Sequence, residues 1–135
     1  MTLESPDTLF AQTIPGLLLT RARQWPDRVA LRSKRRGIYV ECNWRALACR
    51  VAIIARALER LGLKRGDRLA IMGDACEEWL LFDLACQALG GITYGIYPTA
   101  SASELAYQMT DGGAEIFVAE DQEYVDRILS VADAL

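Results

Sequence analysis

The side chains best suited to chemistry lie just after the apolar run 68–72. Asp74 follows this run, and Cys76 comes immediately before an amphipathic segment. Glu77 and Glu78 begin that segment, and a pair of carboxylates can serve as general acid and general base. A thiol near a helix N-terminus can have a lowered pKa. An acidic residue at the carboxyl end of a central strand lies where open α/β sheets bind ligands.

Each of these residues also has a structural interpretation. Glu77 and Glu78 would stabilise a helix that begins with them, because carboxylates interact favourably with the positive end of the helix dipole. We prefer this role to acid–base catalysis. For Asp74 we favour an N-cap over a ligand contact. Cys76 has no basic residue close in sequence, so we do not expect a reactive thiol.

Other catalytic equipment is missing from the sequence. The 135 residues include no histidine, which removes the commonest general base and any serine-centred triad. No strand is followed by G-x-G-x-x-G, and no G-x-x-x-x-G-K-[ST] is present. The residues therefore predict an α/β module without catalytic residues, metal site or bound cofactor of its own.

Composition indicates one globular domain that does not bind nucleic acid. Hydrophobic residues make up 52% of the chain and charged residues 24%, which excludes disorder. The net charge of −3 gives no positive field for nucleic acid. The cluster Lys34-Arg35-Arg36 lies between two strand-like runs. We interpret it as a solvated turn, with an anion or membrane patch as the alternative.

The cysteine pattern favours free thiols in a cytoplasmic protein. None of the four cysteines forms a C-x-x-C pair, and each lies among apolar residues; they are Cys42, Cys49, Cys76 and Cys86. We expect reduced core thiols rather than zinc ligands. The first ten residues lack the pattern of a signal peptide, and no apolar run could span a bilayer. Membrane contact would therefore be peripheral.

The first half of the chain predicts two helices and a β-hairpin. Pro15 suits the first turn of a helix over 15–25, which Pro26 ends. Alternating runs at 29–34 and 38–44, around Gly37, predict a hairpin. A long amphipathic helix follows over 44–61, with Asn43 as its cap and Gly62 as its stop.

The second half alternates strands and helices. Apolar runs predict three buried strands at 68–72, 93–97 and 116–119. Helices are expected between and after them, at 77–89, from 101 to about 110, and from Asp121 to the end of the chain. Ser101 and Glu104 have the spacing of a capping box. The predicted fold class is α/β: a partial, doubly wound, mainly parallel sheet beside an N-terminal helix and hairpin.

Four segments resemble the N-terminal region of the adenylate-forming (AMP-binding) superfamily. They are WPDRVALR (25–32), GIYVECNWRALACRV (37–51), LERLGLKRGDRLAIMGDACEEWLLFDLACQALGG (58–91) and YGIYPTASASELAYQMTDGGAEIFVAEDQEYVDRIL (94–129). Within this superfamily, GIYPT at 95–99 and AEDQ at 119–122 look like the bacterial long-chain fatty acyl-CoA synthetases. The resemblance implies that residues 1–135 are an incomplete N-terminal part of such a domain, with the C-terminal remainder absent.

The resemblance also implies a reaction. The whole enzyme would convert a fatty acid, ATP and CoA to acyl-CoA, AMP and pyrophosphate, with Mg²⁺. The family's signature motifs lie beyond this chain, so no catalytic residue is carried over and the fragment is expected to be inactive alone. One contact is carried over: the loop that contains Thr99 lies near bound CoA in related ligases.

Two alternatives stay open. The chain could be a stand-alone, non-catalytic α/β module that binds CoA or an acyl chain. It could also be a fragment of another acyl- or aryl-CoA synthetase of the same superfamily.

Overall fold

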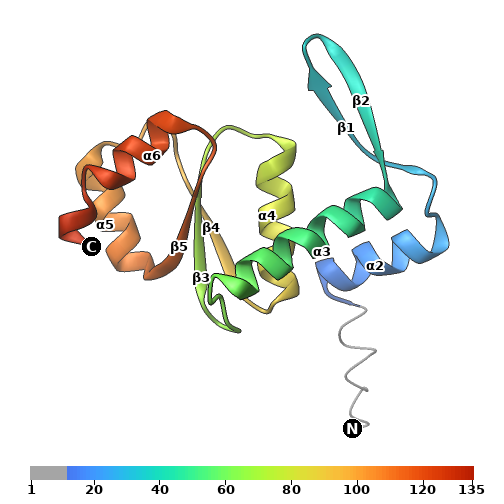
Figure 1. Cartoon of the computed structure of the whole chain (residues 1–135), viewed down its shortest axis with the longest axis horizontal. Helices are drawn as coiled ribbons and strands as arrows, with labels where there is room; N and C mark the ends of the chain where they lie inside the picture. The colour runs from blue at the N-terminus through green and yellow to red at the C-terminus, as the bar shows by residue number, and fades with distance from the viewer. Residues whose placement is uncertain (1–11) are drawn as a thin grey trace, which may run out of the picture.

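The computed structural model describes residues 12–135 (Figure 1). The first ten residues, considered above for a signal peptide, lie outside this range. The elements are α2 (Ile14–Gln24), β1 (Val29–Arg35), β2 (Ile38–Asn43), α3 (Trp44–Arg60), β3 (Arg68–Met72), α4 (Glu77–Ala88), β4 (Ile92–Ile96), α5 (Ala102–Gly112), β5 (Ala114–Ala119), α6 (Gln122–Leu129) and a 3₁₀ turn (Ala132–Ala134). Among these residues, no helix is both long enough and apolar enough to cross a membrane.

The second half of the chain forms a parallel sheet of three strands in the order β4-β3-β5. Strand β3 lies in the centre and is buried from Leu69 to Met72, as its continuous apolar run predicts. Strands β4 and β5 are mostly half-buried or exposed, so the prediction of buried strands is wrong for both. The reason is their place at the two edges of the sheet, where one side of each has no neighbouring strand among the described residues.

Helices cover both faces of this sheet, which confirms the doubly wound class. Successive side chains of β3 point to opposite faces. Leu69 and Ile71 pack in a core with α3 and α4, whereas Ala70 and Met72 pack in a second core with α5. Figure 1 shows α4 on one side of the sheet and α5 and α6 on the other.

Local capping explains where the helices begin and end. The Asn43 side chain accepts a hydrogen bond from the Ala46 amide at 2.8 Å, as predicted, and α3 ends before Gly62, whose φ is +101°. The predicted capping box of Ser101 and Glu104 is present at the start of α5. The last helix was expected to continue to the end of the chain, which is wrong.

Helix α6 stops at Leu129 because the backbone is diverted at the next residue. The Ser130 hydroxyl donates to the Arg127 carbonyl at 2.7 Å, and the Val131 amide bonds to Ile128 in a tighter turn. Serine side chains that bond to nearby carbonyls compete with continued helix.

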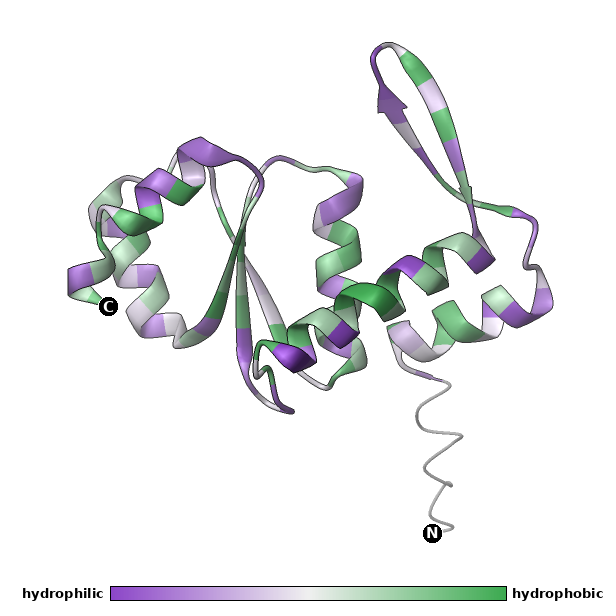
Figure 2. Ribbon diagram, viewed as in Figure 1, coloured by the Kyte–Doolittle hydropathy of each residue, from purple (hydrophilic) through white to green (hydrophobic). Residues whose placement is uncertain are grey.

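The antiparallel hairpin β1–β2 extends past α2 and α3, and Ser33 and Arg35 on β1 contact the start of α4 (Figure 1). Arg36 and Gly37 form its turn with φ of +51° and +82°, as the two-residue turn of a tight hairpin requires. Figure 2 shows polar residues at the tip and alternating polar and apolar residues along β2. The predicted hairpin is confirmed.

The cysteines are less buried than predicted. Cys86 is fully buried, Cys42 and Cys76 are half-buried, and Cys49 is exposed. The prediction of four core thiols is therefore wrong for Cys49. This residue lies on α3 opposite the buried Leu47, since two residues along a helix turn the side chain by about 200°.

Candidate ligand-binding site at the carboxyl edge of the sheet

The carboxyl ends of β3 and β5 meet at a topological switch point. The chain leaves β3 for α4, whose Leu81 packs in the core on one face of the sheet. It leaves β5 for α6, whose Tyr124 and Ile128 pack against the core on the other face. Ligands of open α/β sheets bind in the crevice that such a divergence creates.

A crevice of about 330 Å³ lies at this point and is largely apolar. Trp79 and Phe82 of α4 line one side, and Val118 of β5 lines another. Its charged lining comes from the carboxylates of Glu78 and Glu120. The crevice therefore suits an uncharged apolar group better than a phosphate.

A second hollow, of about 690 Å³, lies between the ends of β3 and β4. Asp74, Gly95 and Tyr97 line it, and Trp79 lines both this hollow and the crevice. A Cβ at Gly95 would lie 3.2 Å from the Trp79 ring. Glycine at position 95 therefore leaves space for the Trp79 indole.

Asp74 is not the N-cap of α4, contrary to prediction. The cap is Cys76, whose sulfur accepts a hydrogen bond from the Trp79 amide at 3.4 Å. The helix begins at Glu77, so Asp74 lies two residues too early to cap it. Instead, the Asp74 amide donates to the Glu120 carboxylate at 2.5 Å, which joins the ends of β3 and β5. The Asp74 side chain lines the second hollow, so the alternative that the sequence offered, a ligand contact, stays open.

This edge has a negative electrostatic character. Partial burial raises the pKa of Tyr124, and the nearby carboxylates, Asp74 and Asp121 first among them, raise it further. In the described part of the chain, no lysine or arginine lines either hollow. Residues 12–135 also contain no group of three or more potential metal ligands. Among the described residues, the two hollows therefore offer no side-chain cation to a phosphate group.

Thr99 lies exposed in a turn after β4. The Ala100 amide donates to the Tyr97 carbonyl at 2.9 Å, and Pro98 occupies the second position, where proline is favoured. Arg127 of α6 fixes this turn by donating to the carbonyls of Pro98 at 2.6 Å and Ala100 at 2.9 Å. The contact of Thr99 with CoA stays a prediction.

Sequence reasoning missed Arg127 as the residue that positions this turn. Its acceptors are backbone carbonyls 27 and 29 residues away, and any residue type supplies a carbonyl. The guanidinium also donates to Glu123 at 2.6 Å, so it is engaged on two sides.

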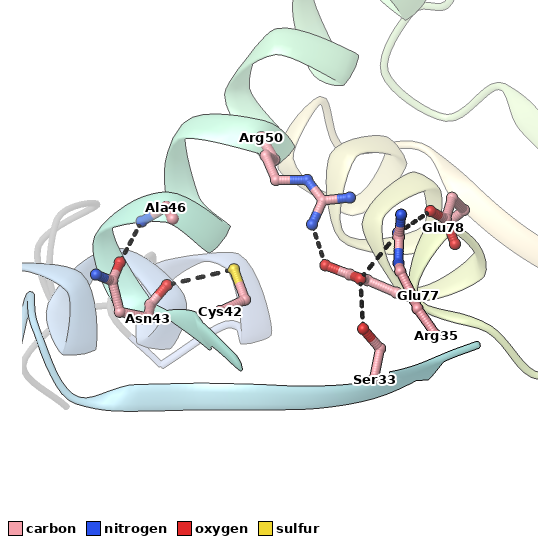
Figure 3. Close-up of polar contacts among 8 residues, drawn as sticks. All are labelled: Ser33, Arg35, Cys42, Asn43, Ala46, Arg50, Glu77 and Glu78. Atoms are coloured by element: carbon pink, nitrogen blue, oxygen red, sulfur yellow. Dashed lines mark hydrogen bonds and ion pairs between the residues drawn. The ribbon is translucent and has the colours of Figure 1, made fainter. Parts of the chain in front are cut away.

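A second polar cluster surrounds Glu77, where the start of α4 faces the hairpin and α3 (Figure 3). Among the described residues, Glu77 is the one charged side chain that is buried. It accepts hydrogen bonds from the Ser33 hydroxyl at 3.0 Å and from Arg35 at 3.3 Å, both on β1. Arg50 of α3 donates to its other oxygen, and Arg35 also reaches Glu78 at 2.7 Å. The cluster joins the hairpin to α3 and α4.

These contacts make Glu77 a structural anion. Burial alone would raise the pKa of Glu77, but the Ser33 hydroxyl and the Arg50 and Arg35 guanidinium groups together lower it. A general acid at neutral pH would need a raised pKa. Glu77 and Glu78 do lie in the first turn of α4, as predicted for carboxylates that interact with the helix dipole. The partners on the hairpin and α3 were not predicted.

Comparison with protein families identifies the fold's relatives. A family model described as AMP-binding enzyme matches residues 18–135, which is most of the chain. The chain belongs to the AMP-binding enzyme family. The resemblance stated from the sequence is confirmed at this level.

Curated relatives of this AMP-binding chain include ligases that are much longer. A long-chain-fatty-acid–CoA ligase of Xenopus laevis is 32% identical over 123 residues, which cover 91% of this chain and 17% of the ligase. A Mycobacterium bovis long-chain-fatty-acid–CoA ligase is 25% identical, over 90% of this chain and 20% of its own length. An uncharacterized protein of Mycobacterium tuberculosis is 34% identical, over 76% of this chain and 57% of that protein. The AMP-binding chain thus spans about a fifth or less of these ligases and just over half of the mycobacterial protein.

Solved structures agree with the fold. A Rhodopseudomonas palustris protein described as a long-chain-fatty-acid CoA ligase has a TM-score of 0.80 and 28% identity, over 91% of this chain and 30% of its own. An anthranilate CoA ligase bound to anthranoyl-AMP also has a TM-score of 0.80, at 22% identity, and supports the fold alone. The AMP-binding chain therefore matches the N-terminal part of adenylate-forming enzymes.

Proposed function

We propose that this chain is the N-terminal part of a long-chain fatty acid–CoA ligase and has no ligase activity by itself. The observation that carries the proposal is the match over nine tenths of this chain to ligases of which it spans about a fifth. The complete enzyme would join a fatty acid to CoA, with ATP converted to AMP and pyrophosphate. In that enzyme residues 1–135 would form an incomplete part of the AMP-binding domain.

The side chains at the carboxyl edge of the sheet support the proposal that this chain alone has no ligase activity. Transfer of a nucleotidyl group needs cations or backbone amides around the phosphates. The two hollows are lined instead by aromatic and aliphatic side chains and by the carboxylates of Asp74, Glu78 and Glu120. ATP and Mg²⁺ would then be held by the remainder of the ligase. CoA would pass near the Thr99 turn, which Arg127 holds in place.

The proposed role of the chain is to contribute a folded layer to the domain. Helices cover both faces of β3, but β4 and β5 each leave one edge unpaired among the described residues. Unpaired strand edges are ready to accept further strands. The free cysteines at 42, 49, 76 and 86 support a reducing, cytoplasmic location.

A chimeric enzyme tests this role. The segment of the Rhodopseudomonas palustris protein that matches this chain would be replaced by residues 12–135, and acyl-CoA formation from palmitate would be measured by mass spectrometry. We expect the chimera to form palmitoyl-CoA, and the same protein without the segment to form none. A chimera that folds, by circular dichroism and gel filtration, yet forms no acyl-CoA would contradict the proposal. Formation of thioester from benzoate alone would favour the aryl-CoA synthetase alternative.

A stand-alone binding module is the second candidate, and the apolar crevice beside Trp79 favours it. This function predicts that the isolated chain binds palmitate with one-to-one stoichiometry in calorimetry. Replacing Phe82 with serine, which adds a polar group to the crevice, would then weaken binding. Absence of heat with both palmitate and CoA at two well-separated temperatures would rule this candidate out, because apolar burial changes the heat capacity.

A further inference from the structure

The tip of the hairpin, residues 34–40, carries positive charge that the rest of the protein does not neutralise. Arg32 is paired with Glu41 at 2.8 Å, and Arg35 is paired with Glu77 and Glu78. Within residues 12–135, no ion pair involves Lys34 or Arg36, and both are exposed. The chain as a whole has a net charge of −3, so the tip is a positive projection on an acidic protein.

Apolar side chains follow these cations directly. Ile38 is 70% exposed, Tyr39 is 67% exposed and Val40 is 48% exposed. Lys34 and Tyr39 are cross-strand partners, so a cation and an aromatic ring share one face of the hairpin. The hairpin is attached to α4 by the bonds of Ser33 and Arg35 to Glu77. The exposed apolar side chains are therefore not needed to hold it in place.

We propose that the tip of the hairpin binds the surface of a bilayer that contains anionic phospholipids. Lys34 and Arg36 would lie among the headgroups, where basic residues are attracted by the negative surface potential. Tyr39 has the amphipathic ring that is enriched at the membrane–water interface, and Ile38 and Val40 would enter the boundary of the acyl chains. In the view of Figure 1 the turn of the hairpin extends past α3 and the start of α4, which leaves the tip accessible to a flat surface.

The size of the tip favours a lipid surface over a protein partner. Stable protein interfaces bury about 800 Å² on each side and involve about 20–30 residues. The tip has three exposed apolar side chains and two unpaired cations, on a narrow turn. Such a small set can support weak, reversible binding to lipid, in which cations and apolar groups contribute together. This inference does not depend on ligase activity.

Vesicle co-sedimentation of the 135-residue chain tests the proposal. Vesicles of phosphatidylcholine would be compared with vesicles that also contain phosphatidylglycerol, without substrate or nucleotide. We expect the chain to bind the anionic vesicles and to be released as salt increases. The partition coefficient should fall about 25-fold in Lys34→Ser/Arg36→Asn, because each of the two cations near an anionic surface contributes about a factor of five. Asparagine is chosen because it accommodates the positive φ at position 36.

A matched variant controls for nonspecific adsorption to the vesicles. Helix α3 also exposes an apolar side chain, Ile53, at 69%, and a basic one, Arg60, but not on a projecting element. Ile53→Ser/Arg60→Ser should bind within about twofold of wild type, whereas Ile38→Ser/Tyr39→Ser should bind as weakly as the charge variant. Circular dichroism would verify that each variant is folded, as expected for exposed positions.

Three results would overturn the proposal. They are equal binding to neutral and anionic vesicles, no binding to either, and loss in the α3 variant that matches the loss in the hairpin variants. A separate readout uses the tryptophan fluorescence of Tyr39→Trp. After the wild-type emission is subtracted, the emission maximum of the added tryptophan should shift to shorter wavelength with anionic vesicles. An unshifted spectrum would also count against membrane insertion of the tip.

Discussion

The Ser33 hydroxyl donates a hydrogen bond of 3.0 Å to the Glu77 carboxylate, which joins the hairpin to α4 across 44 residues of sequence. Arg50 and Arg35 complete the coordination of the same carboxylate from α3 and β1. Three elements that are distant in sequence therefore meet at one buried charge (Figure 3).

Glu77→Gln should destabilise the chain by about 1–3 kcal/mol, because Arg50 and Arg35 lose their shared anion. The effect is smaller than for a fully buried pair, since both guanidinium groups are partly exposed. Urea unfolding monitored by circular dichroism measures it. Glu78→Gln is the matched control: its carboxylate is 53% exposed and should contribute less than about 0.5 kcal/mol. Equal midpoints for the two variants would refute the structural role of Glu77.

The contribution of Glu77 should depend on pH in a defined direction. Its pKa is lowered from 4.5 in the folded chain, so its stabilisation is fully present above 4.5 and is lost as the pH falls through the lower folded value. Wild type and Glu77→Gln should therefore converge in free energy of unfolding below that value. The lowered pKa of Glu104, caused by bonds from Ser101, acts in both proteins and cancels. A difference that stays constant down to acidic pH would contradict the assigned ion pairs.

Arg127→Gln should loosen the turn that contains Thr99. The side chain donates to the Pro98 and Ala100 carbonyls, and its loss leaves both acceptors to water. We expect hydrogen exchange at the Ala100 amide to accelerate about tenfold, corresponding to about 1.4 kcal/mol for the lost bonds. Glu123→Gln, which removes an exposed ion pair of α6 but keeps the carbonyl contacts, should change this rate less than about twofold. Similar acceleration in the two variants would show that Arg127 does not hold the turn.

The thiols should react in the order of their exposure. Cys49 is exposed and should be alkylated fastest, whereas burial raises the pKa of Cys86 and reduces its thiolate fraction. Mass spectrometry after brief iodoacetamide treatment would locate the label. In urea, which unfolds the chain, the rate of labelling of Cys86 should rise to that of Cys49. Rapid labelling of Cys86 in the folded chain would contradict its place in the core.

Most elements of the fold were predictable because their signals are local. The buried positions Leu47, Val51 and Leu58 recur at helical spacing between the cap Asn43 and the stop Gly62, and α3 follows them within one residue. The apolar run of β3 likewise marks the strand that is covered on both faces. The errors occurred where neighbours decide the outcome: β5 has the same apolar character but lies at an edge.

The candidate site was less predictable, because its contacts join distant residues. The N-cap of α4 is an exception: the predicted start at Glu77 was correct and already placed the cap at Cys76, so favouring Asp74 overlooked a local signal. The bond between the Asp74 amide and Glu120 spans 46 residues and involves a backbone donor that no residue type signals. The basic turn at 34–36 was predicted, but which of its cations form ion pairs was not. Arg35 is paired because α4 places Glu77 and Glu78 beside it, whereas Lys34 and Arg36 have no ion pair among the described residues.

Formation of acyl-adenylate by the isolated chain is the most direct test of its proposed status as an inactive part of a ligase. The purified 135-residue protein would be incubated with Mg²⁺, ATP and palmitate, and pyrophosphate release and palmitoyl-adenylate would be measured. We predict no release above that seen without palmitate. Palmitate-dependent release that co-elutes with the chain in gel filtration would contradict the account.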